Sequence, residues 1–260
     1  GGRKRKAAQF VVQTLSGNPH LKTVIFSPTI SMCEKIYDEL PTPLRETAAI
    51  FHSKISVMDK EQILMEFADK RPGHTNVVIA TKAFGMGIDI SNIRNIIHFS
   101  PTSSVLDYVQ ETGRAGRDGQ PAKSTLLYNE KDKELHLFLL DKTLERLEHE
   151  LKSESKLGEN EVQALISVER SKKEKQLDSM FEYCVASGKE CLRNFLQRYF
   201  RIESNSLQYK ENYSITIRIL RWLWLNLLLS DKPTSKEFAI NSCCCFCNPE
   251  YSHPLSRKAH

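Results

Sequence analysis

The sequence has no segment suited to crossing a membrane or to directing export. Its longest apolar run, residues 215–229, contains Arg218 and Arg221 and is shorter than the ~20 residues that a membrane-spanning helix needs. The first residues read GGRKRK with no apolar stretch behind them, so a secretory signal is not expected. We therefore expect an intracellular protein in a reducing compartment, with no membrane partner.

The sequence also lacks two motifs with which many NTPases hold nucleotide. Neither Gly-x-x-x-x-Gly-Lys-Ser/Thr nor Asp-Glu-x-His occurs in its 260 residues. The pair Gly188-Lys189 has neither the upstream glycine nor the following hydroxyl residue. Without a phosphate cradle and a carboxylate for Mg²⁺, this chain alone is expected to hydrolyse no ATP.

No extreme of composition restricts the class of protein. Apolar residues make up 40% and charged residues 27%, as is usual for a globular protein with a substantial core. The 37 basic and 32 acidic residues give a net charge of +5, which permits a polyanionic partner without requiring one. In a reducing compartment the seven cysteines are expected to be thiols or metal ligands before disulfides.

Short apolar runs alternate with amphipathic stretches in the first half of the chain. Expected strands are residues 23–26, 48–51, 77–80, 93–99 and 124–128, and expected helices are residues 31–40, 57–68 and 104–111. Continuous apolar strands separated by helices predict an α/β fold, with a parallel sheet covered by helices on both faces.

The texture changes near residue 129. Residues 130–175 are charged, punctuated by leucine and free of proline, and residues 181–200 form a further helical stretch. We predict one domain over residues 1–135 and a mainly helical subdomain over residues 136–260, with an atypical insertion near residues 201–240.

Residues 110–119, QETGRAGRDG, contain two arginines three positions apart. The planar, permanently charged guanidinium groups of Arg114 and Arg117 suit phosphate oxygens, and small neighbours allow the backbone to approach closely. In phosphoryl transfer, an arginine supplied by another domain stabilises charge on the γ-phosphate. Taken alone, the motif fits equally a surface turn with salt bridges.

Residues 79–89, IATKAFGMGID, follow an expected strand. Sites in open α/β sheets lie at the carboxyl ends of strands, where Thr81 could donate to a nucleic-acid phosphate. Asp89 could accept from a ribose hydroxyl or an arginine. An ordinary turn between strand and helix would also explain the glycines.

Together these segments resemble motifs V and VI of superfamily 2 helicases, and their wording is similar to that of the RecQ family. The resemblance rests on AFGMGID, IRNIIHF and YVQETGRAGRDG and extends over residues 20–200. Residues 24–29 fall where motif IV lies, and residues 50–53 resemble the Tyr-His-Ala-Gly stretch of the family. One departure is Thr29-Ile30, where the family usually has Ser-Arg, so this chain lacks the arginine at that position.

The resemblance implies a RecA-like fold and the second motor lobe of an ATP-dependent 3′–5′ DNA helicase acting in DNA repair and recombination, in the nucleus of a eukaryote. ATP with Mg²⁺ would be bound mainly by a missing N-terminal RecA-like lobe. Arg114 and Arg117 would be the catalytic arginines that reach it, with Arg117 as the arginine finger. The remaining implied sites are nucleotide coupling by Gln110, Gly87 and Asp89, and DNA contacts by Thr81, Ser27, Thr29 and His52.

The family also carries a helical zinc-binding subdomain after this lobe. Its opening Cys-Arg-Arg and Leu-Leu-x-Tyr-Phe stretch resembles residues 191–200, and its closing Cys-x-x-Cys resembles Cys244 to Cys247. The resemblance implies a closed, structural Zn²⁺ site built from Cys191, Cys244, Cys247 and a fourth ligand. Cys243 is the first candidate for that ligand and Cys245 the second.

The remaining cysteines have simpler interpretations. Cys184 precedes Cys191 by two expected helical turns and is read as a buried thiol, and Cys33 is expected to pack in the core. The segment between Cys191 and Cys243 is longer than the family usually has. It is a real inserted helix, a segment that folds only against absent domains, or a product of retained intron sequence.

Two other functions compete with a DNA helicase lobe. One is the equivalent lobe of an RNA helicase or translocase of the same superfamily, which the cysteine set and AFGMGID disfavour. The other is a non-catalytic module that binds DNA or a partner. An in-frame nucleotide-binding lobe encoded upstream of Gly1 would favour the helicase.

Overall fold

The computed structural model describes residues 2–68, 75–85, 90–154, 158–187 and 189–207. It divides into two compact units, Gly1–Phe181 and Glu182–His260. The predicted boundary near residue 135, between the α/β domain and the helical subdomain, stays a prediction. None of the described helices is both long enough and apolar enough for a membrane crossing.

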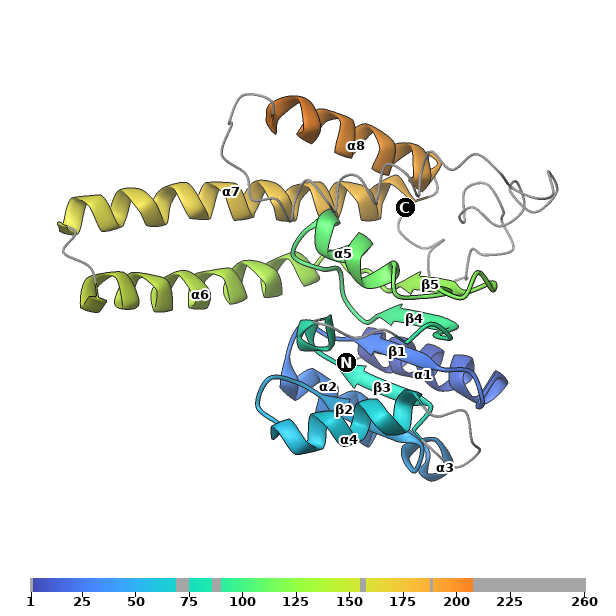
Figure 1. Cartoon of the computed structure of the whole chain (residues 1–260). Coiled ribbons are helices and arrows are strands. Elements are labelled where there is room, and N and C mark those ends of the chain that lie inside the picture. Colours follow the sequence, from blue (N-terminus) through green and yellow to red (C-terminus); the bar gives the residue numbers. More distant parts are fainter. Residues whose placement is uncertain (1, 69–74, 86–89, 155–157, 188, 208–260) are drawn as a thin grey trace. The chain divides into compact units, whose positions relative to one another are not determined.

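The first unit contains a five-stranded, fully parallel sheet (Figure 1). Its order is β2-β3-β1-β4-β5, and the strands are β1 (Thr23–Phe26), β2 (Ala48–Phe51), β3 (Val77–Ala80), β4 (Asn95–His98) and β5 (Lys123–Leu126). Every residue of β1 and β3 is buried, as their continuous apolar sequences predict for a sheet covered on both faces.

Helices alternate with the strands along the chain. They are α1 (Gly2–Gly17), α2 (Ile30–Asp38), α3 (Thr42–Arg45), α4 (Val57–Ala68) and α5 (Val105–Thr112), with a short 3₁₀ helix, η1 (Lys82–Gly85). Thr29 and Ser104 cap α2 and α5 because their side chains accept backbone N–H groups of Met32 and Asp107.

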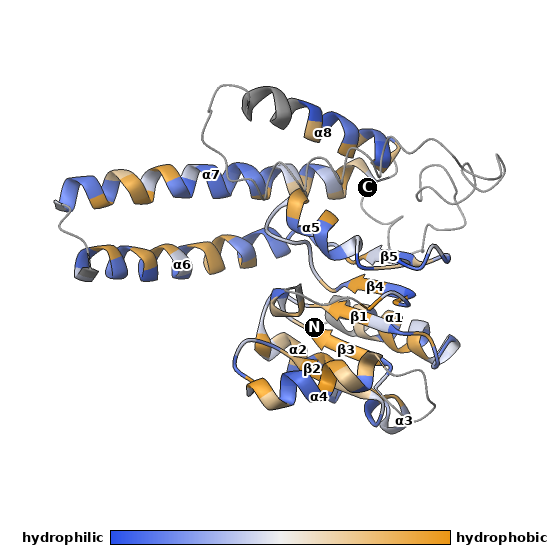
Figure 2. Ribbon diagram, in the orientation of Figure 1, coloured by the Kyte–Doolittle hydropathy of each residue, from blue (hydrophilic) through white to orange (hydrophobic). Residues whose placement is uncertain are grey.

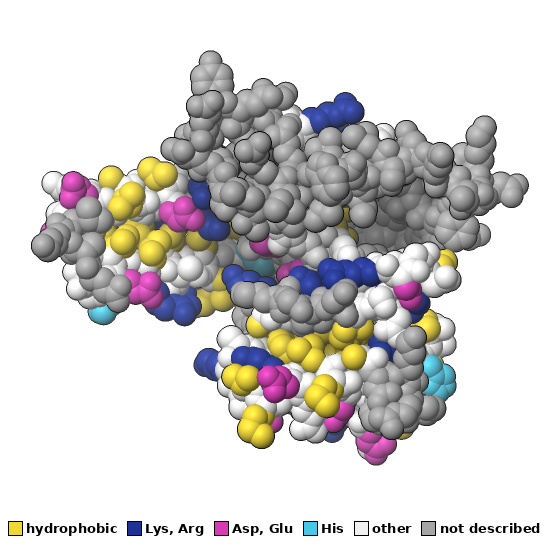
Figure 3. All heavy atoms as spheres, in the orientation of Figure 1, with side chains coloured by type: hydrophobic (Ala, Val, Ile, Leu, Met, Phe, Trp, Pro, Cys, Tyr) yellow, Lys and Arg dark blue, Asp and Glu magenta, His cyan; other side chains and the backbone are white. Residues whose placement is uncertain are grey.

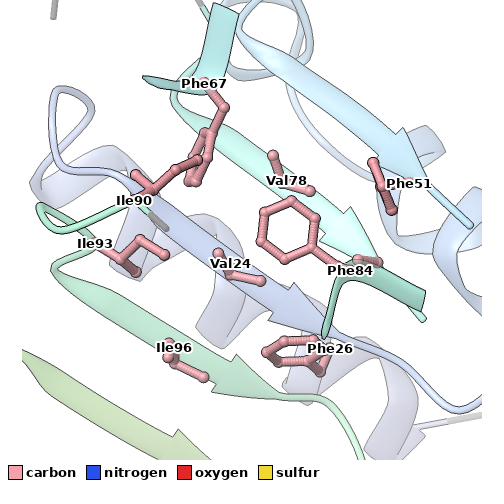
Figure 4. Close-up of a cluster of buried hydrophobic side chains, with 10 residues drawn as sticks. Val24, Phe26, Phe51, Phe67, Val78, Phe84, Ile90, Ile93 and Ile96 are labelled. Carbon is pink, nitrogen blue, oxygen red and sulfur yellow. The ribbon is translucent and has the colours of Figure 1, made fainter. Parts of the chain in front are cut away.

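Two hydrophobic clusters lie on the two faces of the sheet. On one face, Ile25 and Ile79 pack with Val11 and Leu15 of α1 and Ile36 of α2. The other face carries the cluster drawn in Figure 4, which consists of Val24, Phe26, Phe51, Phe67, Val78, Ala80, Phe84, Ile90, Ile93 and Ile96. The predicted α/β architecture with helices on both faces is therefore confirmed.

Phe84 is the centre of the second cluster. It lies on η1, is fully buried, and its ring meets those of Phe26, Phe51 and Phe67 edge-on. Ile90 and Ile93 pack in the same cluster, so both described ends of the connection between β3 and β4 are anchored on this face.

Two long helices, α6 (Asp132–Glu154) and α7 (Glu159–Ala186), follow the sheet (Figure 1). Leu144 of α6 packs with Val162 and Ile166 of α7, and Figure 2 shows hydrophobic residues interspersed with hydrophilic ones along both helices. Within the first unit, His136 of α6 lies 3.3 Å from the Ser100 hydroxyl that follows β4. The helical conformation predicted for residues 130–175 is thus confirmed where the structure describes them.

Helix α8 (Leu192–Leu207) lies in the second unit, where Tyr183 and Phe195 make an edge-on ring contact. The continuous helical stretch predicted over residues 181–200 is wrong, because α7 ends at Ala186 and α8 begins at Leu192. Ser187 and Gly188 are poor helix formers, so the sequence itself disfavours one continuous helix at this point. Cys184 and Cys191 therefore do not share one helix face.

Candidate nucleotide and nucleic-acid site

Three of the predicted DNA-contacting residues follow the carboxyl ends of three neighbouring strands. His52 follows β2, Thr81 follows β3 and Ser27 follows β1. The ladder continues past the strands, since the Thr81 N–H donates to the Phe51 carbonyl at 3.2 Å and the Ser27 N–H to the Ala80 carbonyl at 2.8 Å. Adjacent strands are ~5 Å apart, so the structure brings His52, Thr81 and Ser27 together. These three residues are called the carboxyl edge below.

Two of the predicted DNA contacts have local structural roles in this edge. Ser27 is buried, and its hydroxyl donates to the Thr29 carbonyl at 3.4 Å. The Thr29 hydroxyl accepts the Met32 N–H at 3.2 Å and so begins α2. Thr81 and His52 are half-buried, and His52 Nδ1 accepts the Lys54 N–H at 3.2 Å.

Exposed lysines stand beside the carboxyl edge. Lys54 lies two residues after His52, and Lys82 directly follows Thr81. Lys60 of α4 donates to the Ser53 carbonyl at 3.1 Å and holds that turn. Hydroxyl groups and lysines in this arrangement are the groups with which proteins contact nucleic-acid phosphates.

The two arginines lie at the other edge of the sheet, on residues 113–119, which we call the arginine loop. Helix α5 begins after the carboxyl end of β4 and leads to this loop. The Gly116 N–H donates to the Ile93 carbonyl at 3.0 Å and the Asp118 N–H to the Ser91 carbonyl at 3.3 Å. Since residues 91–93 precede β4, the arginine loop lies at the amino-terminal edge of the strands.

Arg114 and Arg117 differ in their surroundings. Arg114 is half-buried, and burial first, then the positive charge of Arg117, lowers the pKa of its guanidinium. Arg117 is exposed, and its Nε lies 3.4 Å from the Gly113 carbonyl of the same loop. An arginine pKa starts so far above neutrality that the Arg114 side chain stays cationic.

Gly116 and Gly119 give the arginine loop its shape, because both have positive φ angles, +63° and +76°. At Gly116 an added Cβ would lie 2.7 Å from the Gln120 carbonyl oxygen and 3.2 Å from the Ala122 Cβ. Glycine is required here both for the left-handed backbone and for the close approach of the chain.

A buried polar pair that was not predicted from the sequence joins β4 to α5. His98 Nε2 lies 2.8 Å from Glu111 Oε2, and the His98 ring lies against Phe26 at 5.2 Å and Tyr108 at 4.9 Å between centroids. His98 is completely buried. The available signal was a histidine and a glutamate in otherwise apolar, core-facing positions.

A second missed pair lies at the arginine loop. The Arg94 guanidinium makes two hydrogen bonds to the Asp118 carboxylate, of which Nη1 to Oδ1 is 3.1 Å. These residues are 24 positions apart, so no local pattern connects them. Gln110 lies on α5 and is exposed, whereas Gly87 and Asp89 lie outside the described residues.

Of the predicted zinc ligands, only Cys191 lies in the described part of the chain, where it is half-buried. Cys243, Cys244, Cys247 and the alternative Cys245 lie outside it, as does most of the atypical segment at residues 201–240. Among the described residues, no three His, Cys, Asp or Glu side chains form a group that could hold a metal. Cys33 and Cys184 are buried, as predicted.

The part of the chain that contains this site is similar to known helicases. Residues 6–119 match the helicase conserved C-terminal domain. The chain is 29% identical over 192 residues to the ATP-dependent DNA helicase RecQ of Bacillus subtilis, covering 74% of this chain and 28% of that protein.

Two further relatives agree with this match. The ATP-dependent DNA helicase Q5 of Mus musculus is 33% identical, covering 48% of this chain and 12% of that protein. The ATP-dependent DNA helicase RecQ of Pasteurella multocida is 35% identical, covering 54% and 22%. The chain thus spans less than a third of the length of each of these relatives.

Proposed function

Because this chain carries the C-terminal, RecA-like lobe of a RecQ-family superfamily 2 helicase, we propose that it is the second motor lobe of an ATP-dependent 3′–5′ DNA helicase. In this role it acts together with a first RecA-like lobe that binds ATP and Mg²⁺. Its own residues supply positive charge to the nucleotide and contacts to the DNA backbone.

The observation that carries the proposal is the arginine loop. Two arginines stand on a turn whose backbone is tied at Gly116 and Asp118 to the residues before β4. A positive group fixed in advance stabilises developing charge on a γ-phosphate without a reorganisation cost at the moment of reaction. We assign the role of arginine finger to Arg117, which is exposed, and a supporting phosphate contact to Arg114.

The carboxyl edge is the proposed DNA contact. Thr81 and His52 are half-buried, and Lys54 and Lys82 are exposed beside them, which supports contact with phosphates rather than with bases. Ser27 and Thr29 contribute to the same edge mainly by shaping the turn after β1. Thr81 begins the connection from β3 to β4, in which Phe84 and Ile90 pack in one core cluster. Ser91, the residue after Ile90, accepts the Asp118 N–H of the arginine loop. This link supports coupling between DNA and nucleotide through Gln110, Gly87 and Asp89.

We also propose the structural Zn²⁺ site formed by Cys191, Cys243, Cys244 and Cys247, with Cys245 as the alternative to Cys243. Thiolate sulfur is a preferred ligand of Zn²⁺, and such a site stabilises the fold directly. Metal analysis of the purified chain should find one zinc that is lost in Cys191→Ser and in Cys247→Ser. Cys33→Ala, which alters a core thiol, should retain it, and retention of zinc in Cys191→Ser would refute the assignment.

The experiment that tests the helicase role is ATP hydrolysis by the protein in which this chain is joined to its nucleotide-binding lobe. Arg117→Ala should lower kcat by about 10³- to 10⁵-fold, the range known for arginine fingers. Arg170→Ala, which breaks an exposed ion pair with Asp141 on the α6–α7 hairpin, is the matched control and should leave kcat unchanged. Wild-type kcat in Arg117→Ala would refute the proposal.

Substrate and direction are tested by strand separation. Duplex DNA with a 3′ single-stranded extension should be unwound, whereas a 5′ extension or an RNA duplex should not. Thr81→Ala should weaken binding to single-stranded DNA similarly for all sequences, because a phosphate contact carries no base information. Preferential unwinding of RNA would favour the RNA helicase lobe instead. The isolated chain should show no ATPase activity.

A further inference from the structure

The anchoring of the arginine loop depends on a residue outside the loop. Arg94 is the residue immediately before β4. Its N–H donates to the Lys22 carbonyl at 2.9 Å, and its carbonyl accepts the Lys123 N–H at 2.8 Å. Bonds to the chain on both sides thus fix the Arg94 backbone as part of the sheet.

From this fixed position the side chain reaches the far end of the arginine loop. The guanidinium makes two hydrogen bonds to the two oxygens of Asp118. A two-bond pairing of this kind specifies orientation as well as distance, because both groups are planar. The hydrogen bond from Arg94 is the main cause that lowers the pKa of Asp118, so the carboxylate stays charged at neutral pH.

Asp118 in turn organises its own loop. Its N–H donates to the Ser91 carbonyl at 3.3 Å, and its Oδ1 accepts the Gln120 N–H at 3.1 Å. The Gly119 N–H donates to the Gly116 carbonyl at 2.9 Å, which closes the turn that follows Arg117. A displacement of Asp118 would therefore move the backbone that carries the adjacent Arg117.

We propose that Arg94 is a positioning residue for phosphoryl transfer, which holds Asp118 and thereby sets where the arginine loop presents Arg117. The inference rests on the proposed function, since it requires that Arg117 reaches nucleotide on another lobe. In this role Arg94 acts through Asp118 and not on the nucleotide itself. The two backbone hydrogen bonds from Gly116 and Asp118 do not by themselves fix the orientation of the side chains on the loop. The pairing of Arg94 with Asp118 ties the loop to the sheet at this point.

A merely structural role predicts a different result from a positioning role. The side chains of Arg94 and Asp118 are 20% and 28% exposed, and exposed ion pairs contribute little to global stability. A displacement of ~1 Å in a catalytic group, however, can cost ~10²-fold in rate. The proposal therefore expects a large effect on kcat and a small effect on the thermal midpoint.

The test measures ATP hydrolysis and thermal unfolding of the protein that joins this chain to its nucleotide-binding lobe. Arg94→Ala and Asp118→Asn should each lower kcat by about 10- to 100-fold, with KM for ATP within about twofold of wild type. The double variant should be no slower than the slower single variant, because both changes break one pair. Arg94→Lys, which keeps the charge but not the paired geometry, should recover part of the rate.

Controls separate the possible failures. Arg170→Ala removes another surface ion pair and should leave kcat and KM unchanged. If Arg117→Ala is slow but Arg94→Ala has wild-type kcat, the positioning role is wrong and the proposed function stands. If Arg117→Ala itself has wild-type kcat, the proposed function is wrong, and the positioning role of Arg94 is wrong with it. A loss of kcat in Arg94→Ala that only matches the fraction of unfolded protein would also overturn the inference.

Discussion

Substitution of the two left-handed glycines of the arginine loop gives a sharp test of its geometry. Alanine at either position must adopt a positive φ, which costs ~1–2 kcal/mol for a residue with a Cβ. At Gly119 nothing lies within 4 Å of the added Cβ, so this strain is the main cost. At Gly116 the Cβ would lie 2.7 Å from the Gln120 carbonyl oxygen, a backbone atom that cannot move freely.

The expected magnitudes follow from this difference. Overpacking of a tight site adds ~1–3 kcal/mol, so Gly116→Ala should cost ~2–5 kcal/mol and Gly119→Ala ~1–2 kcal/mol. The reduced entropy of the unfolded chain favours both variants similarly and cancels in their difference. Urea unfolding of the chain measures both free energies.

The comparison also has a clear failing outcome. Equal losses of stability in the two variants, together with equal kcat values of the two-lobe protein, would mean that the close approach at Gly116 is absent, and the reasoning about this turn would be refuted. If the loop instead shifts to relieve the contact, stability falls less. In that case kcat of the two-lobe protein should fall further in Gly116→Ala than in Gly119→Ala, because the shift moves the arginines.

Three further predictions concern the core of the first unit. Phe84→Ala should lower the free energy of unfolding by ~3–5 kcal/mol and Phe84→Leu by less, measured by urea unfolding, because the ring fills the centre of a buried cluster; equal losses would contradict this. Burial raises the pKa of the Cys33 thiol to about 11, so the contribution of this thiol to stability should be constant below pH ~9 and fall between about 9 and 11. Cys33→Ala should lack that fall. Burial lowers the pKa of His136, so the contribution of this residue to stability should be fully present above pH ~6.5 and be lost as the pH falls below that value. His136→Gln should flatten this dependence.

The exposed hydrophobic residues of the helical hairpin suggest no function by themselves. Phe138, Leu165 and Val168 are exposed, and Figure 3 shows hydrophobic side chains on the surface of this hairpin. Nothing in the structure identifies what would cover them. They mark positions where substitution by polar residues should be tolerated.

Much of the fold could be predicted from local patterns. Short, mostly apolar runs of four residues predicted β1, β2 and β3 with their bounds, and β1 and β3 are buried along their whole length. Helix α1 was not predicted, although Phe10, Val11 and Leu15 have helical spacing.

The candidate site shows the same division between local and long-range information. The sequence by itself determined the residue types and their spacing: two arginines beside glycines, and a threonine after a buried strand. It did not determine that Thr81 and His52 meet at one edge while Arg114 and Arg117 stand at the other. The order of parallel strands decides that, because only the sheet places segments far apart in the chain side by side.

The supporting pairs could be decided only by the tertiary structure. His98 meets Glu111 across the step from β4 to α5, and Arg94 meets Asp118 across 24 residues. An ion pair or a buried hydrogen bond between distant residues has no period and no fixed spacing, so it leaves no signature in one sequence. Its geometry exists only once the sheet holds one partner and the loop presents the other.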